Sequence, residues 1–186
     1  AGLAAGDTAW YHYLRGLIEA HEGDFAAANT AYDEAVATAP SDLARARFVL
    51  ARFSSRLRDE GALSNDELAT LRRNVDQYRG RSAGYRFAEQ YAAALHVRGE
   101  SADAIRFLEE QLRTLPPQER EVHDDLRLHL GLIAGARDGV GRTALNSLLN
   151  NADDRDKQRI ALQLLAGASG EGAARSAFRA TLVRLI

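Results

Sequence analysis

Apolar residues recur along the chain at spacings of three and four, the spacing that gathers them on one face of an α-helix. Three such stripes stand out: Ala46-Val49-Phe53-Leu57, Leu68-Leu71-Val75-Tyr78 and Ile105-Leu108-Leu112-Leu115. No segment alternates apolar and polar residues over the length of a strand. The pattern therefore predicts an all-α fold without a β-sheet.

The stripes are separated by residues that begin and end helices. Ser41 and Ser64 precede two apolar segments, and Glu67, three places after Ser64, completes a capping box. Glycines mark the expected helix ends, at Gly23, Gly61, Gly80, Gly99 and Gly170. These signals predict helices at residues 7–22, 25–39, 42–60, 65–79, 83–98, 102–115, 118–136, 140–150, 154–168 and 171–185. Short turns should pair them into five antiparallel hairpins.

The predicted hairpins repeat. An offset of 76 residues aligns 9–40 with 85–116, matching Gly16 with Ala92, Gly23 with Gly99, Ala28 with Ala104, Tyr32 with Leu108 and Pro40 with Pro116. This order of small residue, turn glycine, alanine, large residue and proline resembles the tetratricopeptide repeat, whose two helices recur about every 34 residues. The resemblance is weaker in 42–80 and after 117. It implies one domain over 1–186, a right-handed α-solenoid of about five antiparallel helix hairpins.

The first helix departs from this pattern. Positions that are usually large and apolar in the family are polar here: His12, Arg15 and Glu19. The apolar residues lie one place earlier, at Tyr11, Leu14 and Ile18. Either this helix is rotated, or it is an end of the stack with fewer neighbours. At the other end, helix 171–185 is apolar to the chain terminus, which indicates a truncated stack or a homodimer contact through that helix.

Charge narrows the classes of partner. The 186 residues carry 24 Lys and Arg against 26 Asp and Glu, a formal net charge of -2. A balanced chain is not built as a general binder of nucleic acid or anionic membranes, and no apolar run is long enough for a membrane span. Arg72, Arg73, Arg79, Arg81 and Arg86 form one basic stretch. We interpret it as a solvated, ion-paired face, with a phosphate or acidic-peptide patch as the alternative.

Two features of composition concern the origin of the chain. Cysteine is absent, which removes disulfides and thiolate metal sites and leaves the compartment open between cytoplasm and periplasm. Lys157 is the only lysine, a bias toward arginine that indicates a GC-rich bacterial genome. The chain begins at Ala1 and contains no methionine, so we expect it to be part of a longer protein.

Candidate chemistry is sparse. The closest pair of histidines, His123 and His129, is six residues apart and lies on different helix faces, so we expect no metal site. Residues 136–143 lack the first glycine and the lysine of a phosphate-binding loop, and we expect a turn there. No nucleophile, acid and base are assembled by the pattern, so we expect no cofactor and no catalytic residues.

The family resemblance implies a concave groove, lined by the first helix of each hairpin, that holds a peptide or helix of a partner protein. The matching positions are Trp10, Tyr13, Leu17 and His21 in the first repeat, and Arg86, Glu89 and His96 in the third. For Trp10 and Tyr13, core packing is the alternative role. Tyr13 and Leu17 replace the Lys and Asn with which some family members clamp a peptide carboxylate.

The sequence thus predicts a noncatalytic scaffold or adaptor. Bacterial proteins resembling it serve in secretion, pilus or envelope assembly. The alternative is a regulatory or targeting domain of a larger enzyme, such as a peptidase or transferase, whose catalytic part lies outside this sequence.

Overall fold

The computed structural model describes residues 5–168, and every regular element within that range is an α-helix. The all-α prediction is confirmed for this part of the chain. The chain divides into two compact units, Ala1–Arg98 and Gly99–Ile186. The predicted helix 171–185, its proposed homodimer contact and Gly170 lie outside the described residues.

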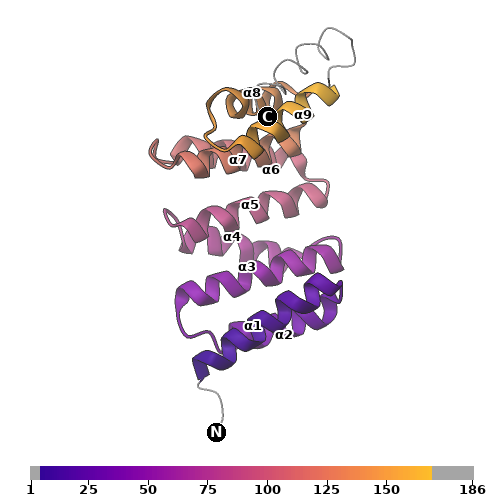
Figure 1. Cartoon of the computed structure of the whole chain (residues 1–186), viewed down its shortest axis with the longest axis vertical. Coiled ribbons are helices and arrows are strands. Elements are labelled where there is room, and N and C mark those ends of the chain that lie inside the picture. Colours follow the sequence, from indigo (N-terminus) through magenta and orange to yellow (C-terminus); the bar gives the residue numbers. More distant parts are fainter. Residues whose placement is uncertain (1–4, 169–186) are drawn as a thin grey trace. The chain divides into compact units, whose positions relative to one another are not determined.

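The first unit contains α1 (Ala5–Glu22), α2 (Phe25–Ala37), α3 (Asp42–Asp59), α4 (Asn65–Gln77) and α5 (Ser82–Val97). Each begins and ends within a few residues of its predicted range. α1 packs against α2, α3 packs against both α1 and α2, and α5 packs against both α3 and α4 (Figure 1). Helices α1, α3 and α5 therefore follow one another in space, although each is separated from the next in sequence by another helix.

The second unit contains α6 (Ser101–Thr114), α7 (Arg120–Ala134), α8 (Gly139–Asn151) and α9 (Arg155–Ala168). Its centre is α7, which packs against α6, α8 and α9, and α8 also packs against α9. The α8–α9 core is formed by buried Leu145, Leu148, Ala152 and Ala161.

The predicted helix boundaries have the expected local chemistry. Ser41 Oγ accepts a hydrogen bond from the Ala44 N–H at 3.2 Å, and the capping box of Ser64 and Glu67 is present. The glycines predicted to end helices within the described range have left-handed backbones: Gly23 at φ 88°, Gly61 at 73°, Gly80 at 73° and Gly99 at 85°. Gly135, which sequence analysis did not single out, ends α7 at φ 80°. Glycine adopts this conformation without the steric cost that a Cβ brings.

Two hairpins depend on a close approach between their helices. A Cβ atom built on Gly16 of α1 would lie 2.6 Å from Cε1 of Tyr32 on α2. A Cβ atom on Gly131 of α7 would lie 2.5 Å from Cδ2 of Leu145 on α8. Tyr32 and Leu145 are buried, so neither can swing away into solvent. Both sites therefore require a small residue on the first helix against a large one on the second.

This contact fixes the orientation of α1. With Gly16 against Tyr32, the polar positions also face α2: Nδ1 of His12 lies 2.7 Å from Oε2 of Glu34, and Nη2 of Arg15 lies 3.7 Å from the same oxygen. A rotation of α1 that would bury the apolar stripe is therefore not observed, and Tyr11, Leu14 and Ile18 are exposed to solvent.

The close approach predicts an unusual response to a small substitution. Alanine is a better helix former than glycine by about 1 kcal/mol, but in Gly16→Ala the added methyl group collides with the Tyr32 ring. We expect the free energy of unfolding to fall by about 1–3 kcal/mol in urea denaturation followed by circular dichroism. The matched control is Gly139→Ala in α8, where a Cβ meets nothing within 4 Å, and it should be neutral or stabilising. Equal stability of the two variants would refute the close approach.

Candidate protein-interaction surface

The predicted partner-binding residues at the start of α1 have a structural role as well. Trp10 and Tyr13 are half-buried and pack on Phe48 of α3, with ring centroids 5.0 and 4.8 Å from it. The Trp10 and Phe48 rings meet edge to face, a favoured aromatic geometry. This cluster joins α1 to α3 while leaving part of both rings at the surface, so core packing and surface exposure coexist.

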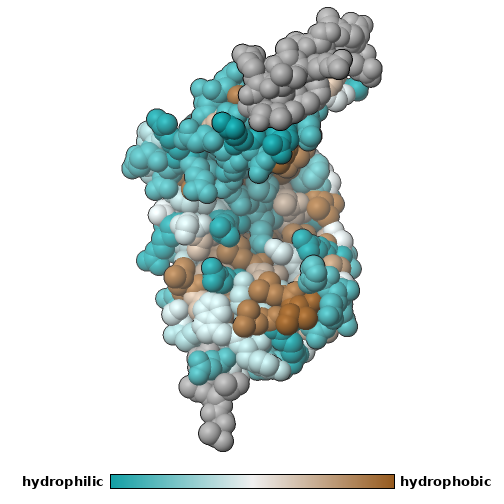
Figure 2. Space-filling view, in the orientation of Figure 1, coloured by the Kyte–Doolittle hydropathy of each residue, from teal (hydrophilic) through white to brown (hydrophobic). Residues whose placement is uncertain are grey.

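The predicted residues farther along α1 are more open. His21 is exposed, and Leu17 is 41% exposed. Leu17 belongs to a larger set, the α1 apolar face, which comprises Tyr11, Leu14, Leu17 and Ile18 at 54, 55, 41 and 58% exposure. Figure 2 shows hydrophobic surface gathered over the region that α1 occupies in Figure 1. An exposed apolar group of this kind is characteristic of a surface that another molecule covers.

The predicted residues of α5 differ in how far they are exposed. Arg86 and His96 are exposed, and Glu89 is half-buried. The side toward α3 is occupied, because Nε2 of Gln90 donates to the Leu50 carbonyl oxygen at 2.8 Å. Since α3 lies between α1 and α5 (Figure 1), the two predicted groups are not in contact but border the same three-helix layer.

Sequence reasoning missed the part that α3 contributes. The guanidinium carbon of Arg47 lies over the Trp10 ring, 5.9 Å from its centroid, and Arg47 is exposed. A positive charge in this position is attracted by the π-electrons of the ring. One repeat length of 34 residues carries Tyr13 onto Arg47, so the signal was present. It was not used because residues 42–80 resemble the family only weakly.

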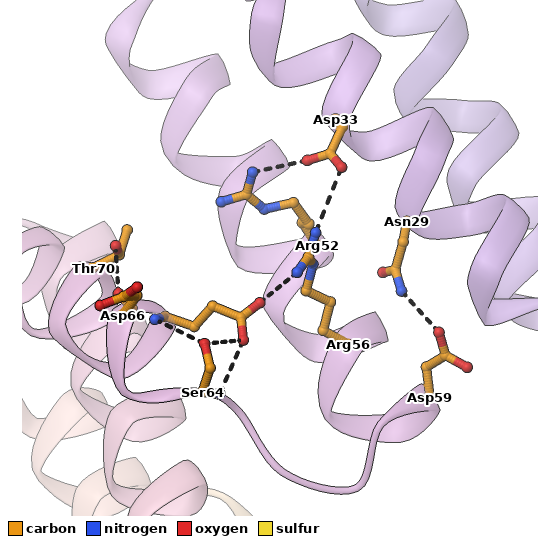
Figure 3. A network of polar contacts seen from close by, with 9 residues as sticks. Asn29, Asp33, Arg52, Arg56, Asp59, Ser64, Asp66 and Thr70 are labelled. Carbon is orange, nitrogen blue, oxygen red and sulfur yellow. Dashed lines mark hydrogen bonds and ion pairs between the residues drawn. The ribbon is translucent and has the colours of Figure 1, made fainter.

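A polar network holds α2, α3 and the start of α4 together (Figure 3). Asp33 of α2 accepts from Nη1 of Arg52 at 2.9 Å, and its other oxygen lies 3.6 Å from Nη2 of Arg56. Arg56 also donates from Nη1 to Oε1 of Glu67 at 2.5 Å. Oε2 of Glu67 accepts from the backbone N–H of Ser64 at 3.0 Å. Asp33 and Glu67 are therefore both paired with arginines of α3, and these pairs link α2, α3 and α4.

The pKa of Glu67 reflects this pairing. Burial favours the neutral carboxyl and would raise the pKa, but the hydrogen bonds from Ser64 and the charge of Arg56 outweigh it and lower the pKa below its ordinary value. Burial would lower the pKa of Arg56, but its hydrogen bond to Glu67 and the negative charges of Glu67, Asp33 and Glu60 raise it. Both groups are thus held in their charged forms.

The basic stretch is partly neutralised from within. Asp76 Oδ1 lies 2.6 Å from Nη2 of Arg79, and its Oδ2 lies 3.5 Å from Nε of Arg72. Arg73 donates to the Thr70 hydroxyl at 2.9 Å. These contacts fit the ion-paired face that sequence analysis favoured.

In the part of the chain that the structure describes, no group of three or more His, Asp or Glu side chains could hold a metal ion. None of the helices between residues 5 and 168 is both long and apolar enough to cross a bilayer. Comparisons with protein-family models, curated proteins and solved structures found no match.

The low pKa of Glu67 has a consequence for acid stability. A carboxyl whose pKa is lower in the folded state contributes stability above its unfolded pKa of about 4.3 and loses it as the pH falls through the folded value. Glu67→Gln should therefore lower stability by roughly 1 kcal/mol at neutral pH, and its difference from wild type should shrink below about pH 4.

Urea denaturation at a series of pH values measures this difference. The control is Asp66→Asn, which removes a neighbouring exposed carboxylate that belongs to neither the capping box nor the arginine pairs. A Glu67→Gln deficit that stays constant from neutral pH to pH 3 would show that the charge of Glu67 is not what the network uses.

Proposed function

We propose that the chain is a noncatalytic protein-interaction module, a right-handed α-solenoid of helix hairpins similar to tetratricopeptide repeats. Its first unit holds a peptide or helix of a partner protein along the layer formed by α1, α3 and α5. The observation that carries this proposal is the α1 apolar face, exposed beside the Trp10–Phe48 cluster at the edge of that layer.

The order of helix contacts supports a repeating stack in the α1–α2 and α7–α8 hairpins, whereas α4 packs on α5 and not on α3. Helix α3 packs on both α1 and α2, and helix α5 packs in the same way on both α3 and α4. The small-against-large contact recurs in two hairpins, Gly16 with Tyr32 and Gly131 with Leu145. A stack in which each hairpin contacts its neighbours leaves one continuous side of the first helices for ligands.

The chemistry of the layer favours a partner segment with an apolar anchor. At α1, Leu17 offers exposed apolar surface close to the half-buried Trp10 and Tyr13 rings, and aromatic residues dominate the energy of protein interfaces. Helices α3 and α5 add exposed charged side chains, Arg47 and Arg86, to the exposed apolar Leu43 and Val97. Polar contacts with α3 and α5 would determine the direction and register of the bound segment and would contribute less to its affinity.

The test is to capture a partner protein with the whole wild-type chain and with two variants that each replace an exposed leucine by aspartate. Leu17→Asp places a charge in the proposed binding layer, and Leu132→Asp places one at a site of α7 that is 50% exposed and outside it. Because both leucines are exposed, we expect both variants to fold. A partner captured by the wild type should be retained by Leu132→Asp and weakened at least tenfold in Leu17→Asp, the effect of about 1.4 kcal/mol.

Mass spectrometry of the captured protein, followed by titration of a synthetic segment of it, gives the readout. Retention of the partner by Leu17→Asp, or its equal loss in Leu132→Asp, would contradict the assignment of the α1–α3–α5 layer. Absence of any specific partner would contradict the interaction function itself.

A further inference from the structure

The second unit contains a cavity of about 550 Å³ that the predicted groove residues do not touch. One wall is apolar and comes from the end of α6 and the turn after it, through Leu112, Leu115 and Pro117. The rest of the lining is polar and comes from α7 and from Asn151 at the end of α8. A few polar groups beside an apolar wall are the usual composition of a site for a small organic ligand.

The polar lining is one face of a single helix. Arg120, His123, Asp124 and Arg127 follow one another at spacings of three, one and three, which places them together along α7. Asp124 is buried, at 7% exposure, and its Oδ1 lies 3.2 Å from Nη1 of Arg127. This pair balances its own charge. The Arg120 side chain makes no hydrogen bond or ion pair within the described residues, so among the arginine and aspartate side chains of the lining one positive charge is left uncompensated.

His123 adds an unused polar atom. Its Nδ1 is buried and has no hydrogen-bond partner in the part of the chain that the structure describes. Leaving a buried polar atom unpaired costs free energy, and such an atom in a folded protein calls for an explanation. Because protein atoms cover this nitrogen, a ligand in the cavity becomes its partner only when the His123 ring turns toward the ligand.

We propose that this cavity binds an organic monoanion, a carboxylate attached to a short apolar group. The Arg120 guanidinium can donate two parallel hydrogen bonds to the carboxylate, with His123 as a further polar partner. The apolar group lies against Leu112 and Leu115. A dianion such as phosphate is disfavoured, because Arg120 supplies a single uncompensated positive charge and Asp124 is already paired with Arg127.

Two sources offer this chemistry, a free small acid and the C-terminal carboxylate of a peptide, and the probes distinguish them. Hexanoate represents the free acid, with hexanamide as its neutral analogue. An acetylated tripeptide ending in leucine, with a free or an amidated C-terminus, represents the chain end. Inorganic phosphate tests the preference for a monoanion. Each is titrated into the full chain by calorimetry at low ionic strength, which preserves charge interactions.

The variants are Arg120→Gln and the matched control Arg137→Gln, which removes an exposed arginine of the same unit that does not line the cavity. We expect millimolar binding of hexanoate or of the free-acid peptide, at least about tenfold weaker in Arg120→Gln and unchanged in Arg137→Gln. The neutral analogue of whichever probe binds, hexanamide or the amidated tripeptide, should not bind. Should Arg120→Gln fail to fold, the shift of the His123 ring protons on adding hexanoate or the free-acid peptide to the wild type gives the same information.

Binding of either carboxylate probe in this manner supports the site and identifies its source. Equal binding of the acid and amide forms, equal loss in the two arginine variants, tighter binding of inorganic phosphate, or no saturable binding of either carboxylate would overturn the proposal. Because the cavity lies in the second unit, these results are independent of the partner-capture experiment on the α1–α3–α5 layer.

Discussion

The close approach of paired helices is the constraint on which most of this structure depends. Gly16 against Tyr32 and Gly131 against Leu145 leave no room for a Cβ atom, so each pair fixes both the separation and the rotation of its hairpin. Turn glycines such as Gly23 and Gly135 then allow the chain to reverse within a few residues. Once a hairpin is fixed in this way, the side of its first helix that faces the partner helix is determined, and so is the side left for other contacts.

That determination explains why α1 exposes apolar residues. Rotating the helix to bury Leu14 and Ile18 would move Gly16 away from Tyr32 and break the hairpin contact. The contact of His12 and the ion pair of Arg15 with Glu34 instead occupy the face of α1 toward α2. The exposed stripe is thus a consequence of hairpin packing, and it provides the surface on which the proposed interaction function rests.

Much of the fold was predictable because residue spacing and helix-capping residues determine the positions of the helices locally. Spacings of three and four located the described helices, and Ser64 with Glu67 located the start of α4. What could not be predicted was the outcome of competing patterns. The stripe of Tyr11, Leu14 and Ile18 indicated one buried face of α1, whereas Gly16 required another. The charged face of α7 could not be predicted either, because nothing in the sequence distinguishes Asp124, which is buried against Arg127, from its neighbour Asp125.

Native-state hydrogen exchange of a Gly131→Ala variant tests most directly whether hairpin close approach governs a nearest-neighbour stack. The added methyl group would meet Leu145, and in such a stack the damage should stay with adjacent helices. The account predicts faster amide exchange in α7, α8 and their packing neighbours, with exchange in α1 and α2 unchanged. Uniformly faster exchange across α1–α9 would contradict it, since the chain would then unfold as one cooperative core.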